Sequence, residues 1–217
     1  MVVLDKPAGL LALPIKGSDT PSALSLLVAK LKLKRQRALV VHRIDHFASG
    51  ALLFAKAGPD RDVLVRQFLD HTPVGSISRY SAAVSALRQG RSCTIFDVKE
   101  CFNSCARRET PKRLVPNFDI PVERLFADAS LVRVELVTGL QNQVRAQFSA
   151  MGYSVIGDRK YHRSESSEQL IARVALHAAY LQFAHPRSGQ SVSIDCKLPP
   201  DFQHLVRELS HSSRERR

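Results

Sequence analysis

Apolar residues are spaced along this chain in two ways, and the spacing predicts both strands and helices. Residues 51–55 form an unbroken apolar run, Ala-Leu-Leu-Phe-Ala, which is typical of a strand buried on both faces. In residues 22–33 and 60–70 the apolar positions recur every three or four residues, which predicts two amphipathic helices. Alternation or short apolar runs predict further strands over residues 1–4, 77–84, 130–137, 176–183 and 192–194, and residues 138–145 open another helix.

The polar residues just before the 51–55 run are the first candidates for chemistry. His42, Arg43 and Asp45 place an imidazole, a guanidinium and a carboxylate within four positions, and a Ser-Gly turn signal follows them. A carboxylate at the lip of a buried strand, beside a fixed cation, suits a catalytic group. A polar loop with a surface aspartate has the same pattern, so spacing alone leaves both interpretations open.

Composition and charge narrow the class of protein. The 217 residues are 44% hydrophobic and 24% charged, which is typical of a globular domain with a sizeable core. The net charge of +12 and the isoelectric point near 10.0 favour a polyanionic partner, most often nucleic acid. A membrane surface is less favoured, because the chain has no Trp and no basic helix with a bulky aromatic face. We also find no membrane-spanning apolar run and no signal peptide.

Two smaller features also bear on function. The cysteines at 93, 101, 105 and 196 lack the spacing of a metal site and are interpreted as reduced thiols. A run of five cations between residues 30 and 37 follows the first predicted helix. Cations stabilise the C-terminal end of a helix, and they also bind RNA phosphates, so both interpretations stay open.

The central motif and several other blocks resemble the RluA-type pseudouridine synthases. His42-Arg43-Ile44-Asp45, followed by Ser49-Gly50, is similar to that family's HRLD and TSG motifs, with Ala48 in place of its Thr. The resemblance spans residues 6–202 and keeps the family's order of motifs. Its other blocks are Lys6-Pro7-Ala8-Gly9-Leu10, Thr138-Gly139 with Gln143 and Arg145, Gly157-Asp158, Leu176-His177-Ala178 and the stretch from Leu198 to Phe202.

The resemblance implies roles for individual residues. Asp45 takes the position of the essential catalytic aspartate, and Arg43 that of the arginine which enters the RNA stack where the target base has flipped out. Tyr80 takes the position of the tyrosine that lies against the uracil. Arg145 takes the position of the arginine that pairs with the catalytic aspartate, where a guanidinium would keep the carboxylate ionised. The remaining expected RNA contacts are His42, Arg107, Arg108, Lys112, Arg113 and Gln143.

The implied function is isomerisation of a specific uridine in structured RNA, ribosomal RNA first and transfer RNA next. Asp45 would act as a nucleophile or as a general base, and the sequence leaves both routes open. One rival is an inactive RNA-binding protein of the same fold, because Ala48, Ser78, Leu140 and Asn142 depart from the family pattern. A second rival is a hydrolase, which would need a second catalytic carboxylate.

The resemblance also implies an architecture. We expect an α+β fold with a long, mixed but mainly antiparallel sheet, flanked by helices and crossed by a central cleft. Residues 1–205 would form the catalytic domain, with its first strand truncated and no separate N-terminal RNA-binding module. Residues 206–217 would be a basic and polar tail, frayed from Ser210 onward. We expect no cofactor or metal, RNA as the partner, no membrane association, a monomer, and a cytoplasmic location.

Overall fold

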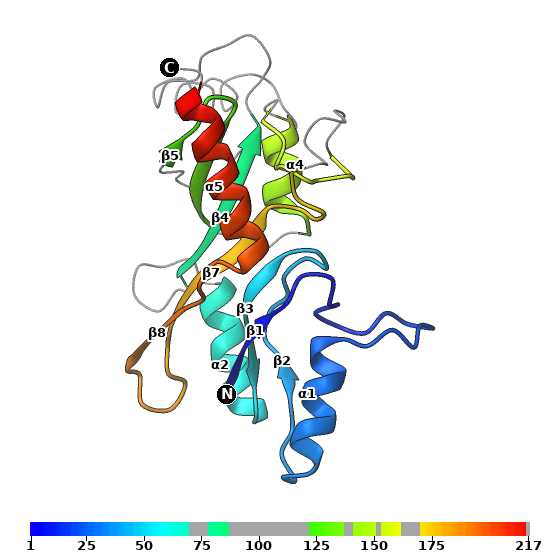
Figure 1. The fold of residues 1–217 in the computed structure, drawn as a ribbon. Coiled ribbons are helices and arrows are strands. Elements are labelled where there is room, and N and C mark those ends of the chain that lie inside the picture. Colours follow the sequence, from blue (N-terminus) through cyan, green and yellow to red (C-terminus); the bar gives the residue numbers. More distant parts are fainter. Residues whose placement is uncertain (70–77, 87–121, 137–140, 151–152, 162–169, 216–217) are drawn as a thin grey trace. The chain divides into compact units, whose positions relative to one another are not determined.

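The computed structural model describes residues 1–69, 78–86, 122–136, 141–150, 153–161 and 170–215, with the backbone alone described at 78–86 and 214–215 (Figure 1). The chain divides into two compact units. The first comprises Met1–Tyr80, Leu136–Gln141 and Ala178–Lys197, and the second Ser81–Glu135, Asn142–His177 and Leu198–Arg217. The predicted single catalytic domain over residues 1–205 stays a prediction.

Strand β3 (Ser49–Ala55) is the centre of the first unit. Strands β1 (Val2–Lys6) and β2 (Leu39–Val40) both pair with β3 in the antiparallel sense. Strand β7 (Leu176–Ala184) pairs antiparallel with β8 (Ser191–Asp195). The helices of this unit are α1 (Ala23–Lys32) and α2 (Gly58–Leu69).

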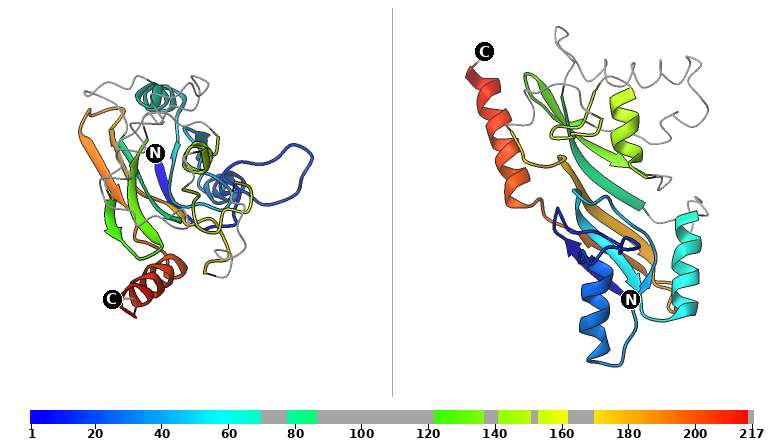
Figure 2. Two further views of the ribbon diagram at one scale, coloured as in Figure 1. Left: turned by 90° about the horizontal axis from the view of Figure 1, so that it is seen from above. Right: turned by 90° about the vertical axis from the view of Figure 1, so that its right-hand side faces the viewer.

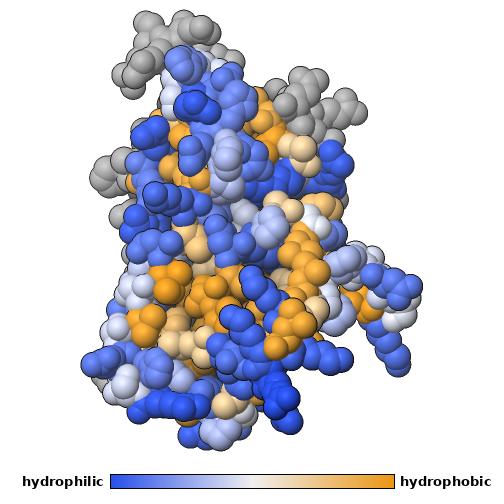
Figure 3. Space-filling view, turned by 60° about the horizontal axis from the view of Figure 1, so that its bottom comes forward, coloured by the Kyte–Doolittle hydropathy of each residue, from blue (hydrophilic) through white to orange (hydrophobic). Residues whose placement is uncertain are grey.

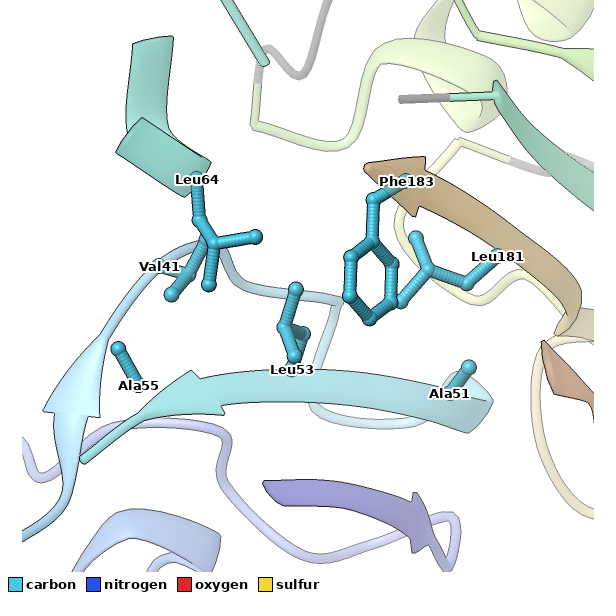
Figure 4. Close-up of a cluster of buried hydrophobic side chains, with 7 residues drawn as sticks. All are labelled: Val41, Ala51, Leu53, Ala55, Leu64, Leu181 and Phe183. Atoms are coloured by element: carbon cyan, nitrogen blue, oxygen red, sulfur yellow. The ribbon is translucent and has the colours of Figure 1, made fainter. Parts of the chain in front are cut away.

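Both faces of β3 are buried, as its unbroken apolar run predicts. Leu53 and its neighbours at alternate positions pack with Leu64 of α2 and with Leu181 and Phe183 of β7 (Figure 4). Leu52 and Phe54 point to the opposite face and pack with α1. Helices α1 and α2 accordingly lie on opposite sides of β3 (Figure 2). This alternation follows from the two-residue period of a strand.

Helix α1 begins one residue after the start of the helix predicted over residues 22–33, because Ser22 is its N-cap. The Ser22 hydroxyl accepts from the backbone N–H of Ser25 at 3.1 Å, and the Ser25 hydroxyl accepts from the backbone N–H of Ser22 at 2.8 Å. This reciprocal pair is a capping box built from two serines.

The second unit also combines strands with helices. Strand β5 (Val122–Leu125) pairs antiparallel with β6 (Ala129–Glu135), and β4 (Ser78–Ala86) begins in the first unit and continues into the second. Among its described residues the helices are α4 (Gln143–Ala150) and α5 (Pro200–Glu215). The pairs β1–β3, β2–β3, β5–β6 and β7–β8 are antiparallel, in agreement with the expected α+β class. The predicted central cleft stays a prediction.

Helix α5 corrects the prediction of fraying from Ser210 onward, as far as Glu215, where the described residues end. The helix continues to Glu215, and Phe202, Leu205 and Leu209 on it are buried. These positions recur at spacings of three and four residues, so one face of the helix packs into the core. The polar residues around them, which include Arg207, Glu208 and the serines at 210, 212 and 213, made the segment polar on average and concealed this face.

The surface mixes apolar and polar side chains (Figure 3). Single exposed apolar residues are normal on a protein of this size. None of the helices in the described ranges combines the length and the apolar character needed to span a lipid bilayer.

Candidate active site

Asp45 lies in the loop that leads from β2 into β3. Its side chain is half-buried, while the neighbouring Arg43 is exposed. The backbone N–H of Ala48 donates to the Asp45 carbonyl oxygen at 3.2 Å, which closes a turn just before β3 begins. Asp45 therefore lies just before the most buried strand of the first unit, as a residue that is partly accessible to solvent.

Lys6, at the end of β1, fixes the backbone next to Asp45. Its side chain is only 1% exposed although it carries an ammonium group. The Nζ atom donates to the carbonyl oxygens of Pro7 at 2.9 Å, Leu10 at 2.7 Å and His46 at 3.0 Å. A buried lysine is tolerated when hydrogen bonds replace its hydration. Lys6 thus holds the loop after β1 against the residue that follows Asp45.

Gly9 and His46 add two more bonds to the same junction. The Gly9 N–H donates to the His46 carbonyl oxygen at 3.1 Å, and His46 Nε2 donates to the Gly9 carbonyl oxygen at 2.7 Å. The His46 ring also stacks on Phe47, with ring centroids 4.3 Å apart. The loop that carries Asp45 is therefore held by backbone and side-chain contacts on its C-terminal side.

His42 is bound to the core strand. The backbone N–H of Leu53 donates to His42 Nε2 at 3.0 Å, and the imidazole stacks on Phe68 of α2 with ring centroids 4.7 Å apart. An accepting Nε2 places the proton of the neutral ring on Nδ1. These contacts anchor the N-terminal side of the Asp45 loop. The expected RNA contact of His42 stays a prediction.

Arg145 in α4 belongs to a buried ion pair of the second unit. Its Nε and one terminal nitrogen each donate to a carboxylate oxygen of Asp158 at 2.7 Å. The other terminal nitrogen donates to Asn142 Oδ1 at 2.9 Å, and the guanidinium lies 5.4 Å from the centre of the Tyr161 ring. This two-bond geometry fixes the orientation of the guanidinium.

Opposing effects act on the pKa of the Asp158 carboxyl. Burial alone would raise this pKa, but the hydrogen bonds and charge of Arg145 outweigh it and hold the pKa below its ordinary value. Backbone N–H groups of Lys160 and Tyr161 also donate to Asp158 Oδ1, at 3.0 and 3.2 Å. Asp158 is therefore a charged partner that orients Arg145.

The start of α4 explains one departure from the family pattern. Asn142 stands where the RluA-type motif has His, and its backbone φ is +53°. Asparagine adopts this left-handed conformation more readily than most residues, and its side chain also binds Arg145 here. Gln143, an expected RNA contact, is 8% exposed in the first turn of α4, and its contact with RNA stays a prediction.

For the remaining predicted site residues, the structure gives only part of the geometry or none of it. Tyr80 lies in β4, where the structure describes the backbone alone. Asp45 and Arg145 belong to different units, and their expected pairing stays a prediction. Four further expected RNA contacts lie outside the described residues: Arg107, Arg108, Lys112 and Arg113.

Sequence reasoning missed two residues of this framework. Lys6 and Asp158 stand in blocks that resemble the family's motifs, but the sequence assigns neither of them a role. A signal for Lys6 was available, because a lysine between an apolar strand and a Pro-Gly turn is well placed to bind loop carbonyl groups. No comparable signal linked Asp158 to Arg145, which lies 13 positions earlier.

Comparison with known proteins adds a consistent result. Residues 1–150 match the family model described as RNA pseudouridylate synthase. The chain is 33% identical to ribosomal large subunit pseudouridine synthase D of Zymomonas mobilis, covering 99% of this chain and 71% of that protein. It is 31% identical to the uncharacterized RNA pseudouridine synthase YlyB of Bacillus subtilis, over 96% of this chain and 70% of that protein. It is 26% identical to the dual-specificity RNA pseudouridine synthase RluA of Haemophilus ducreyi, covering 90% and 88%.

Solved structures agree on the fold. Human RNA Pseudouridylate Synthase Domain Containing 4 superimposes with a TM-score of 0.67 at 17% identity, over 95% of this chain and 88% of that one. The corresponding human Domain Containing 1 protein gives 0.59 at 20% identity, over 91% and 79%. These similarities confirm the predicted fold class.

Proposed function

Because the chain belongs to the RNA pseudouridylate synthase family, we propose that it converts a uridine within RNA into pseudouridine. The predicted resemblance to RluA-type enzymes, and the class of enzyme, are confirmed at the level of the family. In the proposed reaction the bond from N1 of uracil to the sugar breaks. The base turns, and its C5 bonds to the same sugar carbon. C5 then loses its proton and N1 takes one up, so substrate and product are isomers and the proposal includes no co-substrate or cofactor.

The setting of Asp45 is the observation that carries the proposal. Asp45 is a half-buried residue in a loop held on one side by His42 and on the other by Lys6 and His46. A catalytic group needs this kind of fixed backbone, because a misplaced group loses most of its effect. Arg43, two positions earlier, is exposed and close along the chain, which supports its expected role beside a flipped base.

The chemistry assigned to each residue follows from this arrangement. The target base leaves the stack at a cost of about a few kcal/mol. Arg43 occupies the vacated space, and Tyr80 holds the uracil by stacking. Asp45 then attacks the sugar or removes a proton from it, and Arg145 stabilises the ionised form of Asp45. Asp158 acts indirectly, by orienting the Arg145 guanidinium.

The proposed substrate is ribosomal RNA of the large subunit. The name of the Zymomonas mobilis relative assigns that protein to the ribosomal large subunit. A relative from Neisseria meningitidis, 30% identical over 96% of this chain, has the same name. Transfer RNA is the second candidate, and the basic surface of a protein with a net charge of +12 suits either polymer.

Tritium release from RNA labelled at C5 of uridine tests the proposal. Wild-type protein is expected to release tritium from ribosomal RNA, and Asp45→Asn to lower the rate by at least about 10²-fold because it removes the carboxylate that reacts. RNA affinity should stay within about threefold. Asp62→Asn is the control, because it removes an exposed carboxylate of α2 and should leave the rate unchanged.

Three results would contradict the proposal. Tight RNA binding with no release by wild-type protein would favour an RNA-binding protein of the same fold. Formation of free uracil would favour a hydrolase. An Asp45→Asn variant as active as wild type would remove Asp45 from the chemistry.

A further inference from the structure

Five cations at the C-terminal end of α1 form an exposed basic surface, called here the α1 basic turn. Its members are all exposed, and within the described part of the chain none of their side chains has a hydrogen-bond or ion-pair partner. No acidic residue occurs between Asp19 and Asp45 in the sequence. The α1 basic turn consists of Lys30, Lys32, Lys34, Arg35 and Arg37.

The backbone at Arg35 is unusual for an arginine. Its φ is +53°, in the left-handed region where glycine is favoured. The Arg35 N–H donates to the Lys32 carbonyl oxygen at 3.0 Å, and the Gln36 N–H to that of Leu31 at 3.0 Å, which closes the helix in a Schellman-type turn. Glycine would form this turn with less strain. The side chain of Arg35 therefore does not stabilise this turn.

The helix dipole accounts for only part of the α1 basic turn. Lys30 and Lys32 lie in the last turn of α1, where cations are stabilising. Lys34, Arg35 and Arg37 follow the end of the helix at Lys32, and the dipole's equivalent of roughly half a negative charge at that end cannot offset five cations. Without anionic partners, these three like charges repel one another. An external anion would remove that repulsion.

The position of the α1 basic turn relative to Asp45 follows from the strand register. Strand β2 begins two residues after Arg37 and pairs with Ala55 and Phe54, at the far end of β3. Asp45 precedes Ser49, at the opposite end of β3. Seven residues of strand separate the two ends by about 20 Å.

We propose that the α1 basic turn binds the phosphate backbone of the RNA substrate, beyond the end of β3 that lies opposite to Asp45. This inference rests on the proposed function. Phosphates several nucleotides from the target would bind to Lys34, Arg35 and Arg37 and position the RNA without taking part in the reaction. The surface contributes affinity, and the rate at saturating RNA does not depend on it.

The key variants are Arg35→Gly and the triple variant Lys34→Gln/Arg35→Gly/Arg37→Gln. Arg35→Gly suits the turn, so its midpoint of thermal unfolding should be unchanged or higher. The triple variant should bind ribosomal RNA about tenfold more weakly or worse at about 0.1 M salt. The slope of log affinity against log salt should become shallower by about two to three, because each phosphate contact contributes roughly 0.7–0.9. Its rate of tritium release at saturating RNA should stay within about twofold of wild type.

Arg66→Gln is the matched control for Arg35→Gly. Arg66 is another exposed cation without a described partner, on α2, which packs on the opposite face of β3. Each substitution removes one positive charge, so an effect of net charge alone would appear equally in both. Arg66→Gln should leave the affinity and the salt slope unchanged.

Each outcome separates this inference from the proposed function. If wild type modifies RNA and the triple variant keeps the affinity and salt slope of wild type, the inference is overturned and the proposed function stands. If Arg35→Gly lowers the unfolding midpoint, Arg35 has a structural role and the inference is overturned. If wild type binds RNA without tritium release, the proposed function fails, while the salt slopes still test RNA binding by this surface. If the triple variant instead loses retention on phosphatidylserine vesicles and keeps its RNA affinity, a membrane is the partner and the inference is overturned.

Discussion

At the scale of single residues, the candidate site depends on charged groups whose bonds are made inside the protein. Lys6 gives its ammonium to three backbone carbonyl groups, and Asp158 binds Arg145 with both carboxylate oxygens. Both residues are almost fully shielded from solvent, since each is about 1% exposed. Buried charges of this kind stabilise a unique geometry only when their bonding is complete.

Asp158→Asn is expected to lower the free energy of unfolding at pH 7 by about 3–5 kcal/mol, because it leaves the buried guanidinium of Arg145 without its anion. The pKa of Asp158 is lower in the folded than in the unfolded protein, where it is about 3.9. Its stabilising contribution is therefore complete above that value and is lost as the pH falls through the folded pKa. Urea unfolding between pH 3 and 7 measures this loss.

The control for the urea-unfolding experiment is a substitution of an exposed carboxylate. Asp62→Asn serves this purpose, because the Asp62 side chain is 72% exposed and pairs only with the exposed Arg61. Exposed pairs contribute about 0–1 kcal/mol, so little change is expected. An Asp158→Asn variant that lost stability in acid as steeply as wild type would show that Asp158 does not act as described.

At the scale of elements, β3 is held by contacts on both of its sides. Helix α2 is fastened to β7 by Gln67, whose amide nitrogen donates to the Ala184 carbonyl oxygen at 3.0 Å and whose oxygen accepts from the Ala184 N–H at 2.9 Å. Arg187, in the turn between β7 and β8, binds both carboxylate oxygens of Asp60 in α2. These bonds keep α2 against the face of β3 that Leu64 covers.

Gly50, the second residue of β3, lies so close to the backbone of β7 that there is no room for a side chain. Its φ is +107°, and a Cβ there would lie 2.3 Å from the Ala178 carbonyl oxygen of β7. Gly50→Ala should therefore destabilise the protein by more than the roughly 1–2 kcal/mol of left-handed backbone strain alone. Thermal or urea unfolding compares it with Gly17→Ala.

Gly17 is a fitting comparison because its φ is also positive, at +77°, while nothing lies within 4 Å of its Cβ position. Gly17→Ala should show the cost of the backbone conformation without a clash. Equal losses of stability in the two variants would mean that β7 yields at Ala178 and that the close approach has no consequence.

At the scale of the whole molecule, the net charge of +12 governs how the protein meets RNA. Affinity for ribosomal RNA should fall at least about tenfold between 50 and 200 mM monovalent salt, because each neutralised phosphate releases counterions. The rate of tritium release at saturating RNA should change little over this range. Filter binding and single-turnover kinetics at matched salt concentrations measure the two quantities, and a flat affinity would contradict an electrostatic interface.

The sequence by itself determined the features that depend on local pattern. The apolar run at residues 51–55 predicted a strand buried on both faces, because no polar side chain interrupts it. The motif around Asp45 predicted membership of the pseudouridine synthase family, since its residue types and order match the family motif. The fold class followed from that resemblance and was confirmed.

Only the tertiary structure decided which distant residues support the site. The Lys6–His46 bond joins residues 40 positions apart, and Arg145 meets Asp158 across 13, so no local spacing encodes either contact. The helix over Pro200–Glu215 was missed because its polar residues outnumber the few apolar ones that it buries. Sequence patterns reveal the face that an element buries, but the partner of a buried charge depends on how the chain folds back on itself.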